Sequence, residues 1–171
     1  MTHDTSGVRS RKTVWKRLLP GAVVAVLLVA FGLYWFQPWK LFTTKTISDT
    51  PATGAVVLAR GDLVSHEHET SGTAVIVRLP SGGHQLELRD LATSDGPDVR
   101  VWLSGQPVLA GRDGWHVFDD GDRLELGRLK GTHGTQVYDV PEGTDLSRYT
   151  SVTIWCARFS VSFGAAALAR A

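Results

Sequence analysis

Residues 151–164 read SVTIWCARFSVSFG and are the most strand-like stretch of the chain. Apolar side chains alternate along it, at even positions from 152 to 156 and at odd positions from 159 to 163. Successive residues of a strand point to opposite faces, so this change of parity requires an extra residue or a bend. We place the irregularity near Ala157-Arg158.

Cys156 is the single cysteine of the chain, so it cannot form an intrachain disulfide. It shares its parity with Val152 and Ile154 and is expected to point inward. Burial raises the pKa of a thiol and makes it unreactive. Arg158, on the same parity, could lower that pKa if the bend brings it near. The residues alone leave two interpretations open, a reactive thiol or a small core residue.

The charge of the chain is unevenly distributed. Residues 1–45 hold seven Lys or Arg and one Asp, whereas residues 46–171 hold eleven Lys or Arg and sixteen Asp or Glu. The second part therefore has an acidic balance. A nucleic-acid partner is not expected, because phosphate binding needs clustered cations.

Residues 18–36 form an uncharged, apolar stretch, close to the ~20 residues that cross a bilayer. Tyr34, Trp35 and Trp39 follow at its far end, where aromatic rings favour the membrane interface. The cations before it predict that residues 1–17 are cytoplasmic and that the rest lies outside the cell. A cleaved signal peptide usually has ~7–15 apolar residues and ends in small ones. We therefore expect an uncleaved, single-pass signal anchor whose partner is the lipid bilayer.

Residues 37–54 are expected to be a spacer, and residues 55–171 an all-β domain, either an antiparallel sandwich or a barrel-like fold. The turn signals between its short alternating runs are clusters of Gly, Pro, Ser and Asp. Only residues 144–149 have the pattern of a helical turn. The expected strands are residues 55–60, 62–68, 73–79, 85–91, 99–103, 123–129, 135–140, 151–159 and 160–168.

Other chemistry has weaker signals. His66 and His68 are expected to share one strand face and could ligate a metal if a third ligand approached, although a solvated face is the simpler interpretation. Asp119, Asp120 and Asp122 surround a glycine but lack the spacing of an EF-hand loop, which favours a turn. No hydrolase elbow, phosphate-binding loop, zinc-protease motif, c-type haem motif or blue-copper ligand set is present in the sequence.

The sequence of the β domain resembles the DM-thirteen family, a group of extracytoplasmic electron-transfer domains often found beside DOMON domains. The resemblance covers about residues 55–168. It is carried by short matched pieces in a fixed order: Gly61-Asp62-Leu63, His68 with Ser71-Gly72, Leu86 and Leu88, Gly96-Pro97-Asp98, Val101-Trp102-Leu103, Leu126-Gly127, Lys130-Gly131, Gln136 and Tyr138, Ile154-Trp155-Cys156, and Phe163-Gly164.

The resemblance implies a redox role for Cys156, as a bare thiol or as the ligand of a cofactor such as haem. No cytochrome-like domain accompanies the β domain in this chain, so an external redox partner would be required, and an autonomous enzyme is not expected. The alternative is a cell-surface binding or scaffold module in which Cys156 only packs. The sequence assigns no role to Gly96, Pro97 and Asp98.

Overall fold

The computed structural model describes residues 9–171, and the side chains of residues 20–40 and 43–171. The first eight residues of the segment expected to be cytoplasmic lie outside this range. The chain divides into two compact units, residues 1–38 and residues 39–171, which are described separately.

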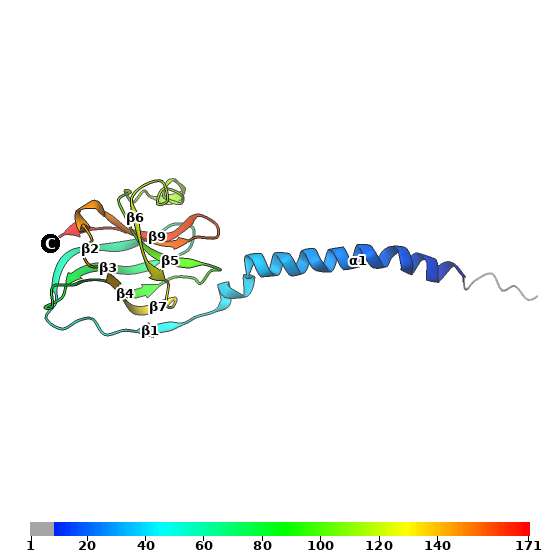
Figure 1. Cartoon of the computed structure of the whole chain (residues 1–171), viewed down its shortest axis with the longest axis horizontal. Helices are drawn as coiled ribbons and strands as arrows, with labels where there is room; N and C mark the ends of the chain where they lie inside the picture. The colour runs from blue at the N-terminus through cyan, green and yellow to red at the C-terminus, as the bar shows by residue number, and fades with distance from the viewer. Residues whose placement is uncertain (1–8) are drawn as a thin grey trace, which may run out of the picture. The chain divides into compact units, whose positions relative to one another are not determined.

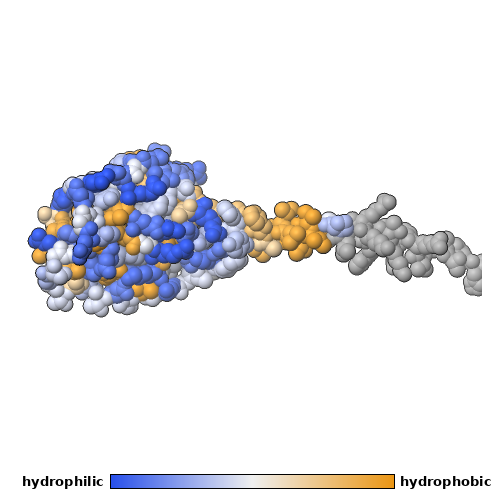
Figure 2. Space-filling model, in the orientation of Figure 1, coloured by the Kyte–Doolittle hydropathy of each residue, from blue (hydrophilic) through white to orange (hydrophobic). Residues whose placement is uncertain are grey.

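The first unit contains one α-helix, α1 (Arg9–Phe36). The 21-residue stretch Pro20–Lys40 is long and apolar enough to cross a membrane, and none of its most apolar window is buried. Figure 2 shows the apolar surface of this helix as a continuous orange band. A signal sequence near the N-terminus passes the same test of length and composition.

The second unit is the β domain. Of three short 3₁₀ helices, η1 (Pro38–Phe42) begins at the last residue of the first unit and precedes the strands. The other two, η2 (Gly111–Gly114) and η3 (Leu146–Arg148), lie in connections between strands. The strands are β1 (Thr46–Ser48), β2 (Val56–Ser65), β3 (Ser71–Arg78), β4 (His84–Ala92), β5 (Val99–Ser104), β6 (Arg123–Arg128), β7 (His133–Val140), β8 (Ser151–Cys156), β9 (Val161–Ala167) and β10 (Ala169–Arg170).

The strands form one curled sheet in the order β1-β7-β4-β3-β2-β9-β8-β5-β6, with β10 beside β2 (Figure 1). Every pairing is antiparallel except that of β1 with β7. The long strand β2 pairs with β3 along its first part and with β9 along its last part, so the sheet curls there into a half-barrel. The expected all-β, barrel-like fold is confirmed.

The main core fills the inside of this half-barrel. Fully or almost fully buried members from every long strand but β6 include Leu63, Ala74, Ile76, Leu86, Leu88, Val101, Leu103, Tyr138, Ile154, Cys156 and Phe163. A second, smaller cluster lies on the other side of β8 and β5, where Trp155, Trp102 and Ala165 pack with Phe118. Phe118 comes from the connection between β5 and β6, residues 105–122, so both faces of β8 are buried.

Three local features differ from the sequence expectations. The two strands expected at 55–60 and 62–68 are one strand, with an irregularity between Val57 and Ala59. The change of parity in residues 151–164 is a hairpin: β8 ends at Cys156, four turn residues follow, and β9 begins at Val161. Within the expected spacer, Thr46–Ser48 is a strand that pairs with β7. The helical turn expected at 144–149 is present as η3.

Candidate functional site

Cys156 is the last residue of β8 and lies at one end of the main core. Its neighbours in the sheet are Val99 of β5 and Val161 of β9. The residue is fully buried, with 0% of its surface exposed, and its thiol is not in a disulfide. The inward orientation expected from strand parity is therefore confirmed.

The turn at residues 157–160 lies directly beside this thiol in the chain. Burial raises the pKa of Cys156, while the backbone N–H groups of Phe159, Arg158 and Asp98 act in the opposite direction. The expectation that Arg158 could lower this pKa is met only through its backbone N–H, and burial dominates. Ser160 closes the turn with a φ of 49°, in the left-handed region that non-glycine residues seldom adopt. The resting thiol is thus neutral, beneath a turn that contains one unfavourable backbone conformation.

The loop 96–98 forms a wall of the same site. A Cβ on Gly96 would lie 2.8 Å from Val99 Cγ2 and 2.9 Å from Phe163 Cζ, so only glycine lets the loop pack this closely. The carbonyl of Asp98 accepts a hydrogen bond from Ala157 N at 2.9 Å and so ties the loop to the turn. Gly96 and Asp98, for which the sequence suggested no role, hold the surroundings of the thiol in place.

The Asp98 carboxylate anchors this wall to the sheet. It accepts hydrogen bonds from Arg100 Nε and Nη2, both at 3.1 Å, and Arg128 Nη2 lies 3.2 Å away. Burial acts to raise the pKa of Asp98, but the hydrogen bonds and charge of Arg100, with the charges of Arg128 and Arg158, bring it below its ordinary value. The carboxylate is therefore ionised at neutral pH and remains paired with arginines.

A polar group that the sequence did not reveal lies in the second cluster. His66 Nδ1 is 2.8 Å from Ser162 Oγ, which is in turn 2.9 Å from Thr153 Oγ1. The other ring nitrogen, Nε2, is 3.0 Å from the carbonyl oxygen of Leu109, in the connection 105–122. Burial lowers the pKa of His66, so its ring is neutral at pH 7. Ser162 is fully buried, so this serine–histidine pair ties the connection to the sheet and is not reachable by a substrate.

The expectation that His66 and His68 share a strand face is wrong. Strand β2 ends at Ser65, and the histidines lie in the bend that follows it. His66 contacts Ser162, while His68 packs on Phe163 with 3.9 Å between ring centroids. Ser162 and Phe163 are adjacent in β9 and point to opposite faces, so the two imidazoles diverge.

The aspartates at 119–122 lie in the turn that leads into β6, as expected. The Asp122 carboxylate is 2.7 Å from Arg148 Nη2. Among the residues that the structure describes, no three His, Cys, Asp or Glu side chains are arranged to hold a metal ion.

Haem does not fit at Cys156 in this conformation. A haem iron needs an approachable sulfur and a cavity for the macrocycle, but this thiol is fully buried between Val99 and Val161. The domain has hollows of about 510, 250 and 400 Å³, and none of these three is lined by Cys156.

These features define a small, curled β domain with one thiol sealed beneath a hairpin turn. The model of the family described as "Electron transfer DM13" matches residues 62–168. The match covers most of the chain, and the protein belongs to this family. The comparisons with curated proteins and with solved structures gave no match.

Proposed function

We propose that the protein is a membrane-anchored electron-transfer domain that lies outside the cell, with Cys156 as its redox-active group. Membership of an electron-transfer family supports the redox role. The uncharged helix segment and the cations before it support the anchor and its orientation, with the N-terminus in the cytoplasm.

One observation carries the choice of residue. The only thiol of the chain lies beneath a short turn whose own backbone N–H groups favour its thiolate form against burial. In the closed turn these N–H groups offset part of the effect of burial on the pKa. When the turn opens, the burial that raises the pKa is removed, and the thiolate forms as water or a partner reaches the sulfur.

The reaction that this thiol can perform is thiol–disulfide exchange with a partner that carries a disulfide. The Cys156 thiolate attacks one sulfur of that disulfide, forming a new S–S bond while the partner's S–S bond breaks. The leaving sulfur departs as a thiolate and takes up the proton that Cys156 released. A thiolate of a separate dithiol donor then attacks the partner's sulfur in the mixed disulfide and restores Cys156. The donor's second thiol attacks the resulting donor–partner disulfide, so the donor is oxidised to a disulfide and the partner is reduced to two thiols.

The alternative function is a binding or scaffold module in which Cys156 is structural. Its complete burial and the direction of its pKa shift favour this alternative, because a packed thiol acts as a small apolar side chain.

Mixed-disulfide formation separates the two functions. The native full-length chain, in lipid nanodiscs, is incubated with a glutathione disulfide buffer and analysed by mass spectrometry. The redox function predicts a reversible adduct on the folded protein that is missing from Cys156→Ser. If the adduct forms only at the rate at which the whole domain unfolds, the thiol reacts only in the unfolded protein. That result would contradict the redox function and support the structural one.

A further inference from the structure

The end of the β domain that carries Cys156 also holds the first residues of that domain. Lys40 Nζ donates a hydrogen bond to the carbonyl of Gly96 at 2.9 Å, and Thr43 Oγ1 donates to Asp95 at 3.1 Å. Farther along, Lys45 N donates to Thr132 Oγ1 at 3.0 Å. Residues 39–45 are therefore fixed to the loops 93–98 and 129–132.

Very little chain separates this fixed segment from the apolar helix. Helix α1 ends at Phe36, and the β domain begins at Trp39. Three steps of fully extended chain reach about 10 Å. If the helix spans the bilayer, as proposed above, the covalent chain keeps residues 39–45 and the loops bound to them near the membrane surface.

The chemistry of this end fits a bilayer surface. We call it the proximal face and define it by residues 39–45, 93–98, 127–132 and 157–160. These segments carry five Lys or Arg and two Asp, although the domain as a whole is acidic. The adjoining bend carries Glu69 and also Glu67, which is paired with His68. Two aromatic side chains of the face are exposed, Trp39 at 51% and Phe159 at 39%.

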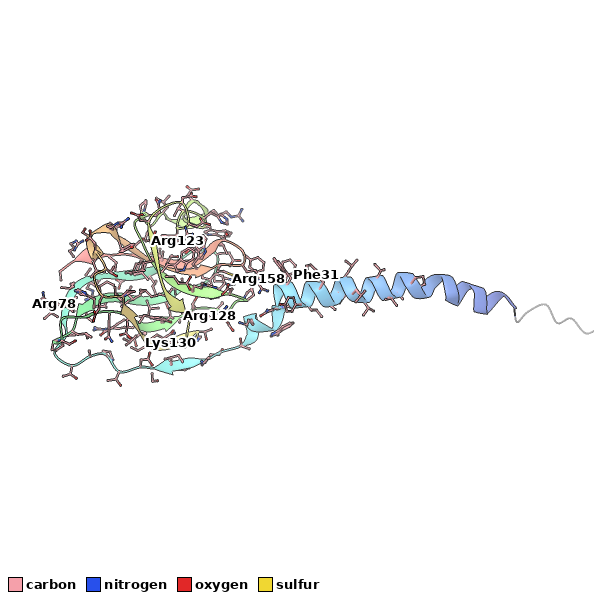
Figure 3. The ribbon with its side chains drawn as sticks, viewed as in Figure 1. Phe31, Arg78, Arg123, Arg128, Lys130 and Arg158 are labelled. Atoms are coloured by element: carbon pink, nitrogen blue, oxygen red, sulfur yellow. The ribbon has the colours of Figure 1, made fainter. Side chains whose placement is uncertain are left out.

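Three of the five basic residues of the proximal face line a hollow, together with Asp95. A depression of about 400 Å³ is lined by Trp39 together with Lys40, Lys45 and Lys130. The side chain of Arg128 is 68% exposed. Figure 3 shows Arg128 and Arg158 toward one end of the β domain and Arg78 at the opposite end.

We propose that the proximal face rests on the bilayer and binds anionic lipid headgroups, an inference that depends on the proposed anchor. Tryptophan and phenylalanine insert at the level of the headgroups, and lysine and arginine pair with their phosphates. The turn over Cys156 belongs to this face. When this turn opens, the sulfur therefore becomes accessible beside the membrane surface, where a membrane-bound redox partner can meet it.

Spin labels at the two ends of the domain test this proposal. Two full-length variants carry Cys156→Ala, one with Phe159→Cys on the proximal face and one with Glu142→Cys in the turn after β7, at the other end. Each is labelled with a nitroxide and placed in nanodiscs that contain a nickel-chelating lipid. Flotation with phosphatidylcholine vesicles is measured first, because a chain that does not float refutes both the anchor and the proximal face.

For a chain that floats, we expect the nickel lipid to relax the label at position 159 several-fold more than the label at position 142. Equal relaxation at both positions, or stronger relaxation at 142, overturns the proximal face and leaves the anchor intact.

The anionic headgroup is tested with the same label at position 159. Replacing part of the phosphatidylcholine with phosphatidylglycerol should increase the relaxation, and Arg128→Glu should reduce that increase. The matched control Arg78→Glu, at the opposite end of the domain, should leave it unchanged. If phosphatidylglycerol has no effect, or if inorganic phosphate at equal concentration abolishes the difference, the specific binding of lipid headgroups is refuted.

Discussion

Phe118 is the residue whose removal tests the second core most sharply. It is fully buried and is the large apolar residue that the connection 105–122 places on Trp155, with 6.4 Å between ring centroids. Truncation of a buried phenylalanine to alanine costs about 3–5 kcal/mol, because apolar contact is lost and a cavity remains. This is a large part of the ~5–15 kcal/mol that stabilises a typical domain.

The assay is urea unfolding of the full-length chain in micelles, followed by tryptophan fluorescence. Phe118→Ala should lower the free energy of unfolding by about 3–5 kcal/mol and shift the native emission to longer wavelength as water reaches Trp155. Phe118→Leu, a smaller truncation that keeps an apolar side chain, should cost less than Phe118→Ala and keeps the test interpretable if the alanine variant does not fold. The matched control is Phe159→Ala, at a residue that is 39% exposed. A loss below about 1 kcal/mol for Phe118→Ala, within the range of an ordinary surface substitution, would refute the second core.

Two further predictions concern His66, which packs on Phe118 in the second cluster, and Gly96, in the wall beside Cys156. Burial lowers the pKa of His66, so the unfolded chain binds a proton on this ring more readily than the folded chain does, and the free energy of unfolding should fall as the pH drops below the ordinary value of 6.5. Urea unfolding at several pH values measures this loss, which should be smaller in His66→Gln. An equal dependence of stability on pH in both proteins would contradict the buried neutral ring. Gly96→Ala should lower stability by about 1–3 kcal/mol through overpacking against Val99 and Phe163. The control in thermal unfolding is Gly83→Ala, where the atom nearest to the new Cβ, Leu79 Cδ1, is 3.7 Å away. Equal melting temperatures for the two variants would argue against tight packing at Gly96.

Strand periodicity was sufficient to predict the fold and the orientation of Cys156. Alternation in residues 151–164 located both strands and the break between them, because a period of two is a local property of the chain. The nature of the break was not predictable from parity, since a bend and a hairpin both reverse it. The sequence pattern places strand ends at Gly61 and Gly72, yet both glycines lie inside strands, β2 and β3. At Gly61 a glycine is needed because an added Cβ would collide with the backbone of Ala167.

The parts of the site that the sequence did not reveal depend on contacts between distant segments. Trp155 packs in the second cluster, on the face of β8 opposite to Cys156, and nothing in residues 105–122 indicates that Phe118 will cover it. The proximity of His66 and Ser162 likewise arises from the pairing of β2 with β9. The short strand β1 lies in a stretch rich in threonine and serine, and its partners in the parallel strand β7 lie 87 residues further along the chain, as in the pair Thr46 and His133.

The measurement that tests the central claim most directly is the rate at which a disulfide reagent modifies Cys156 in the native full-length chain. Ser160 has a φ of 49°, which is unfavourable for a side chain by about 1–2 kcal/mol and costs glycine little. Ser160→Gly should therefore stabilise the closed turn and slow the modification, and Ser160→Val should weaken the turn and speed it, each by roughly five- to thirtyfold, since 1.4 kcal/mol is a factor of ten. The global stability of each variant, from urea unfolding, serves as the reference. We expect modification to be slowest in Ser160→Gly and fastest in Ser160→Val, and faster than global unfolding in each protein. If the modification rate equals the rate of global unfolding in the native chain and in both variants, the thiol is only a packed core residue.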